Sequence, residues 1–154
     1  MDASLAKKKA IRLLTVRDRT VHELRTRLTS DYDEAVVDEV LEYLQEMDFV
    51  NDERFARNYV EQRNRLRPTG NLGLRRELYA KGISQEIVEL VMNSPEEELE
   101  LARRLLESRA PSLMRLSRDV RLRRAYGLLE RRGFPWQTAR AAVEQVLDSD
   151  LPIE

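Results

Sequence analysis

Cysteine is absent from this 154-residue chain, and histidine and tryptophan occur once each. Without cysteine the chain can form no disulfide, no thiolate nucleophile and none of the usual cysteine-based zinc sites. The five glycines are scattered among expected turns and helix ends, so they form no phosphate-binding loop. No apolar run approaches the length needed to span a bilayer. These absences argue against most enzyme classes and against a membrane-spanning protein.

Catalytic and metal-binding groups are equally scarce. The single histidine, His22, lies in the first turn of an expected helix beside Glu23, where an exposed or locally paired side chain is the simpler interpretation. No candidate nucleophile has a neighbouring base. Glu42 and Glu46 share a helical face but lack a third ligand such as histidine. We therefore expect no enzymatic activity, no cofactor and no metal site.

Composition is that of a folded protein, with 36% charged and 42% hydrophobic residues. Three lysines at positions 7–9 precede an apolar stretch, but Arg12 and Arg17 interrupt that stretch at once, unlike in a signal peptide. We expect a cytoplasmic protein with no membrane partner.

One helical pattern occurs three times at constant spacing. A small residue, two bulky apolar residues and an arginine lie at positions i, i+3, i+4 and i+7, which share one face of a helix. A second marker, an apolar residue between a basic helix and the next amphipathic helix, recurs as Tyr32, Ile83 and Phe134. Two agreeing registers indicate a true internal repeat. The three copies of the first pattern are Ala10, Leu13, Leu14 and Arg17; Ala56, Tyr59, Val60 and Arg63; and Ala102, Leu105, Leu106 and Arg109.

Periodicity and capping signals predict three helices in each repeat. Thr20 with Glu23 and Ser94 with Glu97 have the spacing of capping boxes, and glycines at 82 and 133 suit helix ends. Pro111 is expected to end the helix that begins after Ser94. Phe134 and Trp136 are expected to cap the last core. The predicted fold is all-α, an elongated tandem array of three three-helix repeats with about nine helices, at residues 1–50, 51–93 and 94–149, followed by a tail at 150–154.

Charge alternates along the chain although the net charge is only −1. Residues 31–53 contain ten acids and no lysine or arginine, whereas residues 103–132 contain ten arginines and three acids. The pattern predicts basic first and second helices and an acidic third helix in each repeat. Solvated faces and pairing between neighbouring helices account for part of this charge. Arginine also suits bidentate pairing with carboxylates or phosphates, so we expect an arginine-lined binding surface.

Four segments resemble motifs of the RecX regulatory proteins. Residues 49–56, FVNDERFA, resemble the family's G-Y-L-D-D-E-R-F-A segment, and residues 74–83 resemble its L-R-x-E-L-x-x-K-G-I segment. Residues 16–25 are similar to the opening R-D-x-S-x-x-E-L-R, and residues 131–134 match the late R-R-G-F. The chain departs from the family at residues 30–32, where a turn one residue shorter replaces a K-G-F-like turn, and at Gly73, where a basic residue is common.

Resemblance to RecX implies a protein that binds the RecA filament on single-stranded DNA. It also implies inhibition of ATP hydrolysis, filament extension and strand exchange, and thus a role in recombination, DNA repair and the SOS response. We expect a monomer that touches successive RecA subunits, with weak DNA contact as an auxiliary. The arginines expected to face acidic protein surface or phosphate are Arg63, Arg65, Arg67, Arg75, Arg76, Arg121, Arg123 and Arg124.

Two alternatives remain open at this point. A nucleic-acid-binding protein of helix-turn-helix-like units would place the second or third helix of each repeat on a duplex, but acidic third helices would repel phosphates there. A helical-repeat scaffold for an unrelated protein is disfavoured only by the RecX-like motifs.

Overall fold

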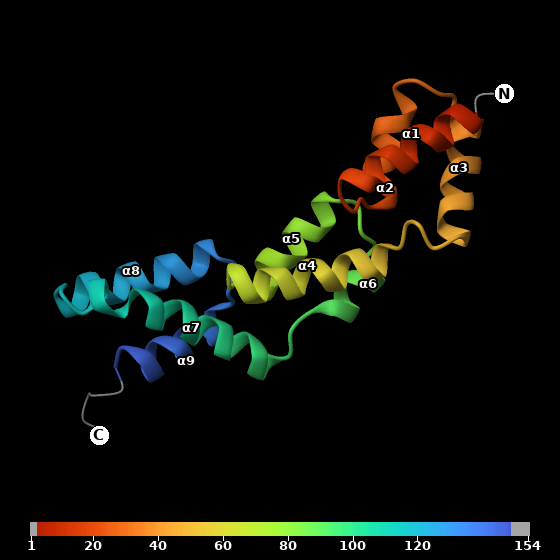
Figure 1. The fold of residues 1–154 in the computed structure, drawn as a ribbon. Helices are drawn as coiled ribbons and strands as arrows, with labels where there is room; N and C mark the ends of the chain where they lie inside the picture. The colour runs from red at the N-terminus through yellow and green to blue at the C-terminus, as the bar shows by residue number, and fades with distance from the viewer. Residues whose placement is uncertain (1–2, 149–154) are drawn as a thin grey trace. The chain divides into compact units, whose positions relative to one another are not determined.

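The computed structural model describes residues 3–148, which form nine α-helices and no strand (Figure 1). The all-α prediction is confirmed, while the predicted tail at 150–154 lies outside the described residues. None of the described helices combines the length and apolar character that crossing a membrane requires. The helices are α1 (Ala3–Val16), α2 (Val21–Thr29), α3 (Glu34–Glu46), α4 (Asp52–Leu66), α5 (Asn71–Ala80), α6 (Gln85–Val91), α7 (Pro95–Leu113), α8 (Arg118–Arg131) and α9 (Trp136–Val146).

The chain divides into two compact units. Of the described residues, unit 1 contains 3–59 together with Leu78–Val91, and unit 2 contains Val60–Glu77 together with 92–148. Helices α4 and α5 therefore each contribute one part to unit 1 and the other part to unit 2.

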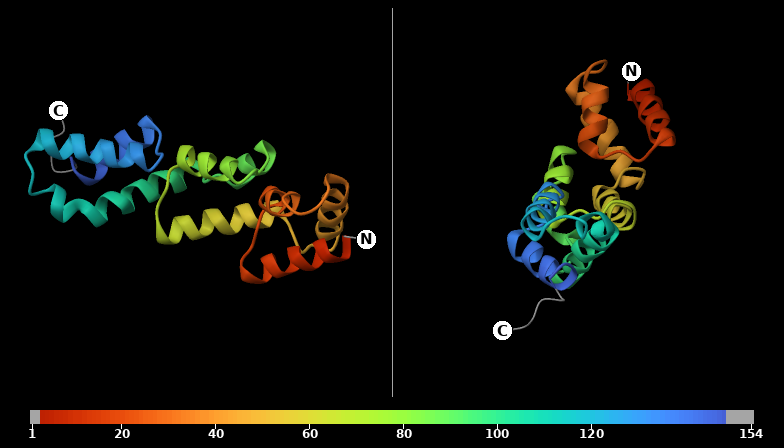
Figure 2. Two further views of the ribbon diagram at one scale, coloured as in Figure 1. Left: turned by 90° about the horizontal axis from the view of Figure 1, so that it is seen from above. Right: turned by 90° about the vertical axis from the view of Figure 1, so that its left-hand side faces the viewer.

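One buried apolar cluster of unit 1 lies among α1, α2 and α3, which pack on one another (Figure 2). Helix α3 is amphipathic because its apolar residues recur at helical spacing, and its acidic residues, such as Glu39 and Glu42, are exposed. Burial of the apolar stripe stabilises this helix more than its intrinsic propensity does. The fully or almost fully buried side chains here are Ala6, Ala10, Leu24, Leu28, Val37, Val40, Leu41, Leu44 and Val50.

The core of unit 2 lies among α7, α8 and α9, with α9 packed mainly on α7. Ala102 begins the repeated pattern in α7 and is fully buried. Its counterparts in the other two repeats, Ala10 and Ala56, are also fully buried, so this small residue faces the interior in every repeat. Phe134, the marker residue of the third repeat, is 3% exposed and joins the same core.

Two helix starts, those of α2 and α7, follow the sequence signals closely. The side chain of Thr20 accepts a hydrogen bond from the backbone of Glu23, and the Glu23 carboxylate accepts one from the backbone of Thr20. Ser94 and Glu97 form the same reciprocal pair at the start of α7. Both predicted capping boxes are confirmed, and each satisfies two of the amide groups that a helix start leaves without an intrahelical partner.

The second helices of the three repeats end in two different ways. The backbone nitrogens of Ile83 and Phe134 donate five residues back, to Leu78 at 3.2 Å and Leu129 at 3.0 Å. The glycine that precedes each donor has a φ of 79° at Gly82 and 81° at Gly133. In the first repeat Tyr32 donates only four residues back, to Leu28, and no left-handed residue is needed. The shorter turn of the first repeat is therefore built differently from the other two.

Three expectations of the sequence are wrong. Pro111 does not end α7, which continues to Leu113, because Met114 still donates to the carbonyl of Ala110 at 2.8 Å. Trp136 does not cap the core, since it is 63% exposed and stacks on Tyr126 with ring centroids 4.9 Å apart. The third helix of the last repeat, α9, is not acidic: it carries one arginine and one glutamate, which pair with each other.

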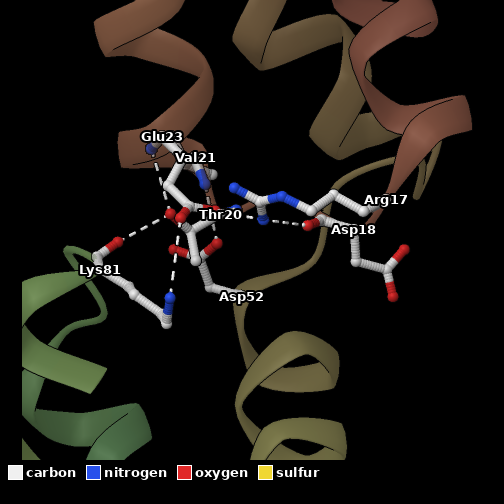
Figure 3. A network of polar contacts seen from close by, with 7 residues as sticks. All are labelled: Arg17, Asp18, Thr20, Val21, Glu23, Asp52 and Lys81. Carbon is white, nitrogen blue, oxygen red and sulfur yellow. Dashed lines mark hydrogen bonds and ion pairs between the residues drawn. The ribbon is translucent and has the colours of Figure 1, made fainter. Parts of the chain in front are cut away.

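Polar contacts join the first and second repeats within unit 1 (Figure 3). The fully buried Thr20 hydroxyl donates to the backbone carbonyl of Lys81 at 2.7 Å. The Asp52 carboxylate accepts from the backbone nitrogen of Val21, the first residue of α2, at 2.9 Å. Gly82 allows this close approach, because a Cβ there would lie 2.2 Å from the Cβ of His22. The start of α2 is thereby fixed against the end of α5 and the start of α4.

Candidate interaction surface

A similar junction joins the second and third repeats within unit 2. The Glu98 carboxylate of α7 accepts a hydrogen bond from the backbone nitrogen of Asn71, the first residue of α5, at 2.5 Å. Gly70 donates to the carbonyl of Arg132 at 2.8 Å. A Cβ on Gly133 would lie 2.2 Å from the backbone nitrogen of Gly73, so only glycine fits there. These contacts fix the start of α5 against α7 and the end of α8.

Burial at this junction shifts the pKa of the Glu98 carboxyl. The residue is 5% exposed, and desolvation raises the pKa of its carboxyl. The hydrogen bond from Asn71, the nearby charge of Arg75 and the hydroxyl of Thr138 act in the opposite direction and stabilise the carboxylate. Glu98 is thus a structural carboxylate that connects α5, α7 and α9.

An arginine-lined hollow of about 530 Å³ lies beside this junction. Its walls come from the end of α4 and the residues that follow it, from the middle of α7 and from the end of α8. The lining residues are Arg65, Leu66, Arg67, Pro68, Arg104, Leu105, Glu107, Ser108, Arg109 and Arg132.

A second hollow, of about 760 Å³, lies between α7 and α8. Arg109 lines both hollows, so they adjoin along α7. We call the two together the arginine groove; it lies wholly in unit 2. The residues that line the second hollow are Arg109, Ser112, Leu113, Leu116, Arg123, Arg124, Gly127, Leu128 and Arg131.

Positive charge is concentrated in the groove, and neighbouring arginines there repel one another. Burial lowers the pKa of Arg132, and the charges of Arg67, Arg109 and Arg63 lower it further. The one acid in the lining, Glu107, lies 3.9 Å from Arg103, which is outside the groove. An anionic partner would relieve the repulsion among these guanidinium groups.

Two guanidinium groups are held in place by the backbone. Arg104 donates to the carbonyl of Asn64 at 3.1 Å, and Arg132 donates to the carbonyl of Pro68 at 2.8 Å. Each bond uses one terminal nitrogen of a group that carries five N–H donors. The remaining donors can form bidentate contacts with a carboxylate or phosphate.

The arginine of the repeated pattern differs among the three repeats. Arg17 lies 3.5 Å from Glu23, and Arg63 lies 3.0 Å from Glu77. Arg109, the equivalent residue of the third repeat, is exposed and forms no ion pair within residues 3–148. The arginine of the pattern thus forms an ion pair within the protein in the first two repeats. In the third repeat, the guanidinium of Arg109 is accessible to a partner.

Only some of the eight arginines predicted from the sequence line the arginine groove. Arg65 and Arg67 line the first hollow, and Arg123 and Arg124 line the second. The other four lie outside the lining of the groove. Arg63 pairs with Glu77, Arg75 lies near Glu98, Arg121 donates to the carbonyl of Leu116 at 3.1 Å, and Arg76 is exposed.

Four further arginines of the groove were missed by the sequence prediction: Arg104, Arg109, Arg131 and Arg132. Arg109 had a signal, because it completes the repeated pattern. No sequence signal indicated the other three arginines, because a local pattern does not show which faces of α7 and α8 border the same hollow.

These features define the class of protein: a helical-repeat protein with fixed repeat junctions and an arginine-lined groove. Family models of the first, second and third three-helix domains of RecX match residues 6–44, 51–92 and 96–143. The chain belongs to the RecX family.

Individual relatives agree with this assignment. The chain is 34% identical over 143 residues to a protein named regulatory protein RecX from Streptomyces coelicolor, covering 91% of this chain and 76% of that protein. It is 35% identical over 153 residues to the one from Corynebacterium efficiens, covering 94% and 73%. The crystal structure of RecX from Lactobacillus salivarius has the same fold, with a TM-score of 0.85 at 24% identity over 94% of this chain and 96% of that chain.

Proposed function

We propose that this protein binds the RecA filament on single-stranded DNA and inhibits its ATPase activity, its extension and its strand exchange. It would thereby regulate recombination and the SOS response as a cytoplasmic, non-enzymatic monomer. Membership of the RecX family is the observation that carries the proposal. The arginine groove supports it physically, because exposed guanidinium groups such as that of Arg109, which forms no ion pair within residues 3–148, suit a partner rather than internal stability.

Within this proposal, the arginine groove makes the main contact with the filament. Arg65, Arg67, Arg123 and Arg124 keep the role expected from the sequence, and Arg109 joins them. A substitution of Arg75 would also disturb the repeat junction, because the charge of Arg75 helps to stabilise the Glu98 carboxylate there. Substitutions in the groove avoid that complication.

The proposal is tested by titrating the protein into a RecA ATPase reaction on circular single-stranded DNA, with binding to the DNA alone measured in parallel. ATP hydrolysis is expected to fall at protein concentrations that leave the DNA largely unbound. Unchanged hydrolysis, or a decrease only once the DNA is coated, would reject RecA as the direct target.

A nucleic-acid-binding protein is the second candidate, and the mutual repulsion around Arg132 is the observation that favours it, because phosphates would also relieve that repulsion. Against it stands helix α3, whose acidic residues Glu39, Glu42 and Glu46 are exposed. Binding to bare DNA that decreases steeply with salt, with no effect on ATPase at low occupancy, would favour this candidate.

A further inference from the structure

The arginine groove is apolar as well as basic. Leu66 lies between Arg65 and Arg67 and is 66% exposed. Leu116 and Leu128, which line the second hollow, are half-buried. Leucine side chains contribute nothing to the binding of phosphates, but they bury area against the apolar side chains of a protein partner.

The groove also lacks the groups that hold unpaired bases. None of the residues that line the two hollows is aromatic. Binding of single-stranded nucleic acid relies on aromatic side chains that stack against the bases. The single tryptophan of the chain, Trp136, is exposed on α9 and stacks on Tyr126 instead of lining the groove.

We infer that the arginine groove binds an acidic, amphipathic helical segment of a protein partner. Carboxylates of the segment pair with the guanidinium groups of residues such as Arg109 and Arg124, and its apolar stripe covers Leu66, Leu116 and Leu128. The inference rests on the proposed function for the identity of the partner, which would be RecA. The chemistry of the segment is inferred from the lining of the groove alone.

The probe is a fluorescent peptide with the sequence of residues 33–48 of this chain, DEAVVDEVLEYLQEMD, which combines seven acids with an apolar stripe. One control peptide replaces the acids by amides, and another keeps the composition but scrambles the stripe. A single-stranded thymidine oligonucleotide serves as competitor. Fluorescence anisotropy with the full-length protein measures binding at several salt concentrations.

We expect the acidic peptide to bind more tightly than both controls, with affinity that decreases as salt rises. Arg109→Glu with Arg124→Glu should weaken binding by at least about tenfold. Leu66→Ser should weaken peptide binding by about fivefold while leaving oligonucleotide binding unchanged. The charge-matched control, Lys8→Glu with Arg57→Glu in unit 1, should bind like the wild type.

Two results would overturn the inference. If Leu66→Ser has no effect and the oligonucleotide displaces the peptide stoichiometrically, the groove is a phosphate site. If sedimentation shows a dimer of the free protein that Arg109→Glu abolishes, the groove is filled by a second copy of the chain.

The peptide experiment tests the chemistry of the groove, and the ATPase experiment tests the proposed function. Inhibition of RecA without peptide binding would reject the acidic-segment inference and leave the proposed function standing. Peptide binding without inhibition of RecA would reject the function and leave the chemistry of the groove standing.

Discussion

The carboxylate of Asp52, at the start of α4, accepts a hydrogen bond at 2.9 Å from the backbone nitrogen of Val21, at the start of α2. Glu98 does the same for Asn71 in the next repeat junction. In each case a carboxylate from the first helix of one repeat binds the first amide of the second helix in the repeat before it. The junctions therefore repeat along with the helices.

This relationship makes Asp52 a sensitive position. Asp52→Ala would leave the Val21 amide without its acceptor and should lower the free energy of unfolding by about 1–3 kcal/mol. Asp52→Asn keeps an acceptor oxygen, so it should cost less than Asp52→Ala at neutral pH. Urea denaturation of the three proteins measures the difference, and an equal loss for both variants would contradict the role of the hydrogen bond.

The Asp52 carboxyl also predicts how the free energy of unfolding changes with pH. Burial raises the pKa of the Asp52 carboxyl above its ordinary value of 3.8. The folded protein therefore binds this proton more tightly than the unfolded chain, and the stability from this group is lost as pH rises from the ordinary pKa through the raised one. The wild type should thus gain stability relative to Asp52→Asn as pH falls from 7 towards 4. A relative loss over that range would contradict the assignment.

Close backbone packing at the second junction is tested at Gly133. Gly133→Ala combines a φ of 81° with a Cβ placed 2.2 Å from a backbone nitrogen, and it should cost about 2 kcal/mol or more. Gly127→Ala is the matched control, because its Cβ would meet only the guanidinium of Arg131 at 3.2 Å inside a helix. The control should stabilise the protein by about 0.5–1 kcal/mol in thermal denaturation. Similar effects of the two substitutions would show that the junction is looser than described.

The two aromatic residues around the start of α9 have different roles. Phe134→Ala should cost about 3–5 kcal/mol, because the side chain is 3% exposed in the core of unit 2. Trp136→Ala should cost only about 1 kcal/mol, the contribution of its stacking on Tyr126. Denaturant titrations compare the two. A larger loss for Trp136→Ala would restore the sequence-based view that this side chain caps the core.

Much of the fold follows from local signals that the structure confirms. Thr20 with Glu23, Ser94 with Glu97, and the left-handed glycines 82 and 133 are each recognisable because the interaction lies within a few residues. The prediction at Pro111 was wrong because a proline is only a local signal for a helix end. Its ring removes one N–H donor and crowds the preceding turn, but α7 continues for two more residues.

The set of residues that line the arginine groove was less predictable, because it depends on tertiary packing. Charge runs indicated that arginines matter, and Arg65, Arg67, Arg123 and Arg124 do line the groove. Arg63 does not, because it pairs with Glu77 on α5, and the sequence alone does not place these two side chains together. The predicted repeat boundaries stay a prediction, and so does the binding role of all eight arginines.

We propose that the arginine groove carries the regulatory function. One experiment compares inhibition of the RecA ATPase on circular single-stranded DNA by the wild type, by Arg109→Glu with Arg124→Glu, and by the control Lys8→Glu with Arg57→Glu. Arg109 forms no ion pair within the described chain, so circular dichroism should show the groove variant to be folded. We expect the groove variant to lose at least about tenfold in inhibitory potency and the control to retain the potency of the wild type. Equal potency of all three proteins would reject this role of the groove.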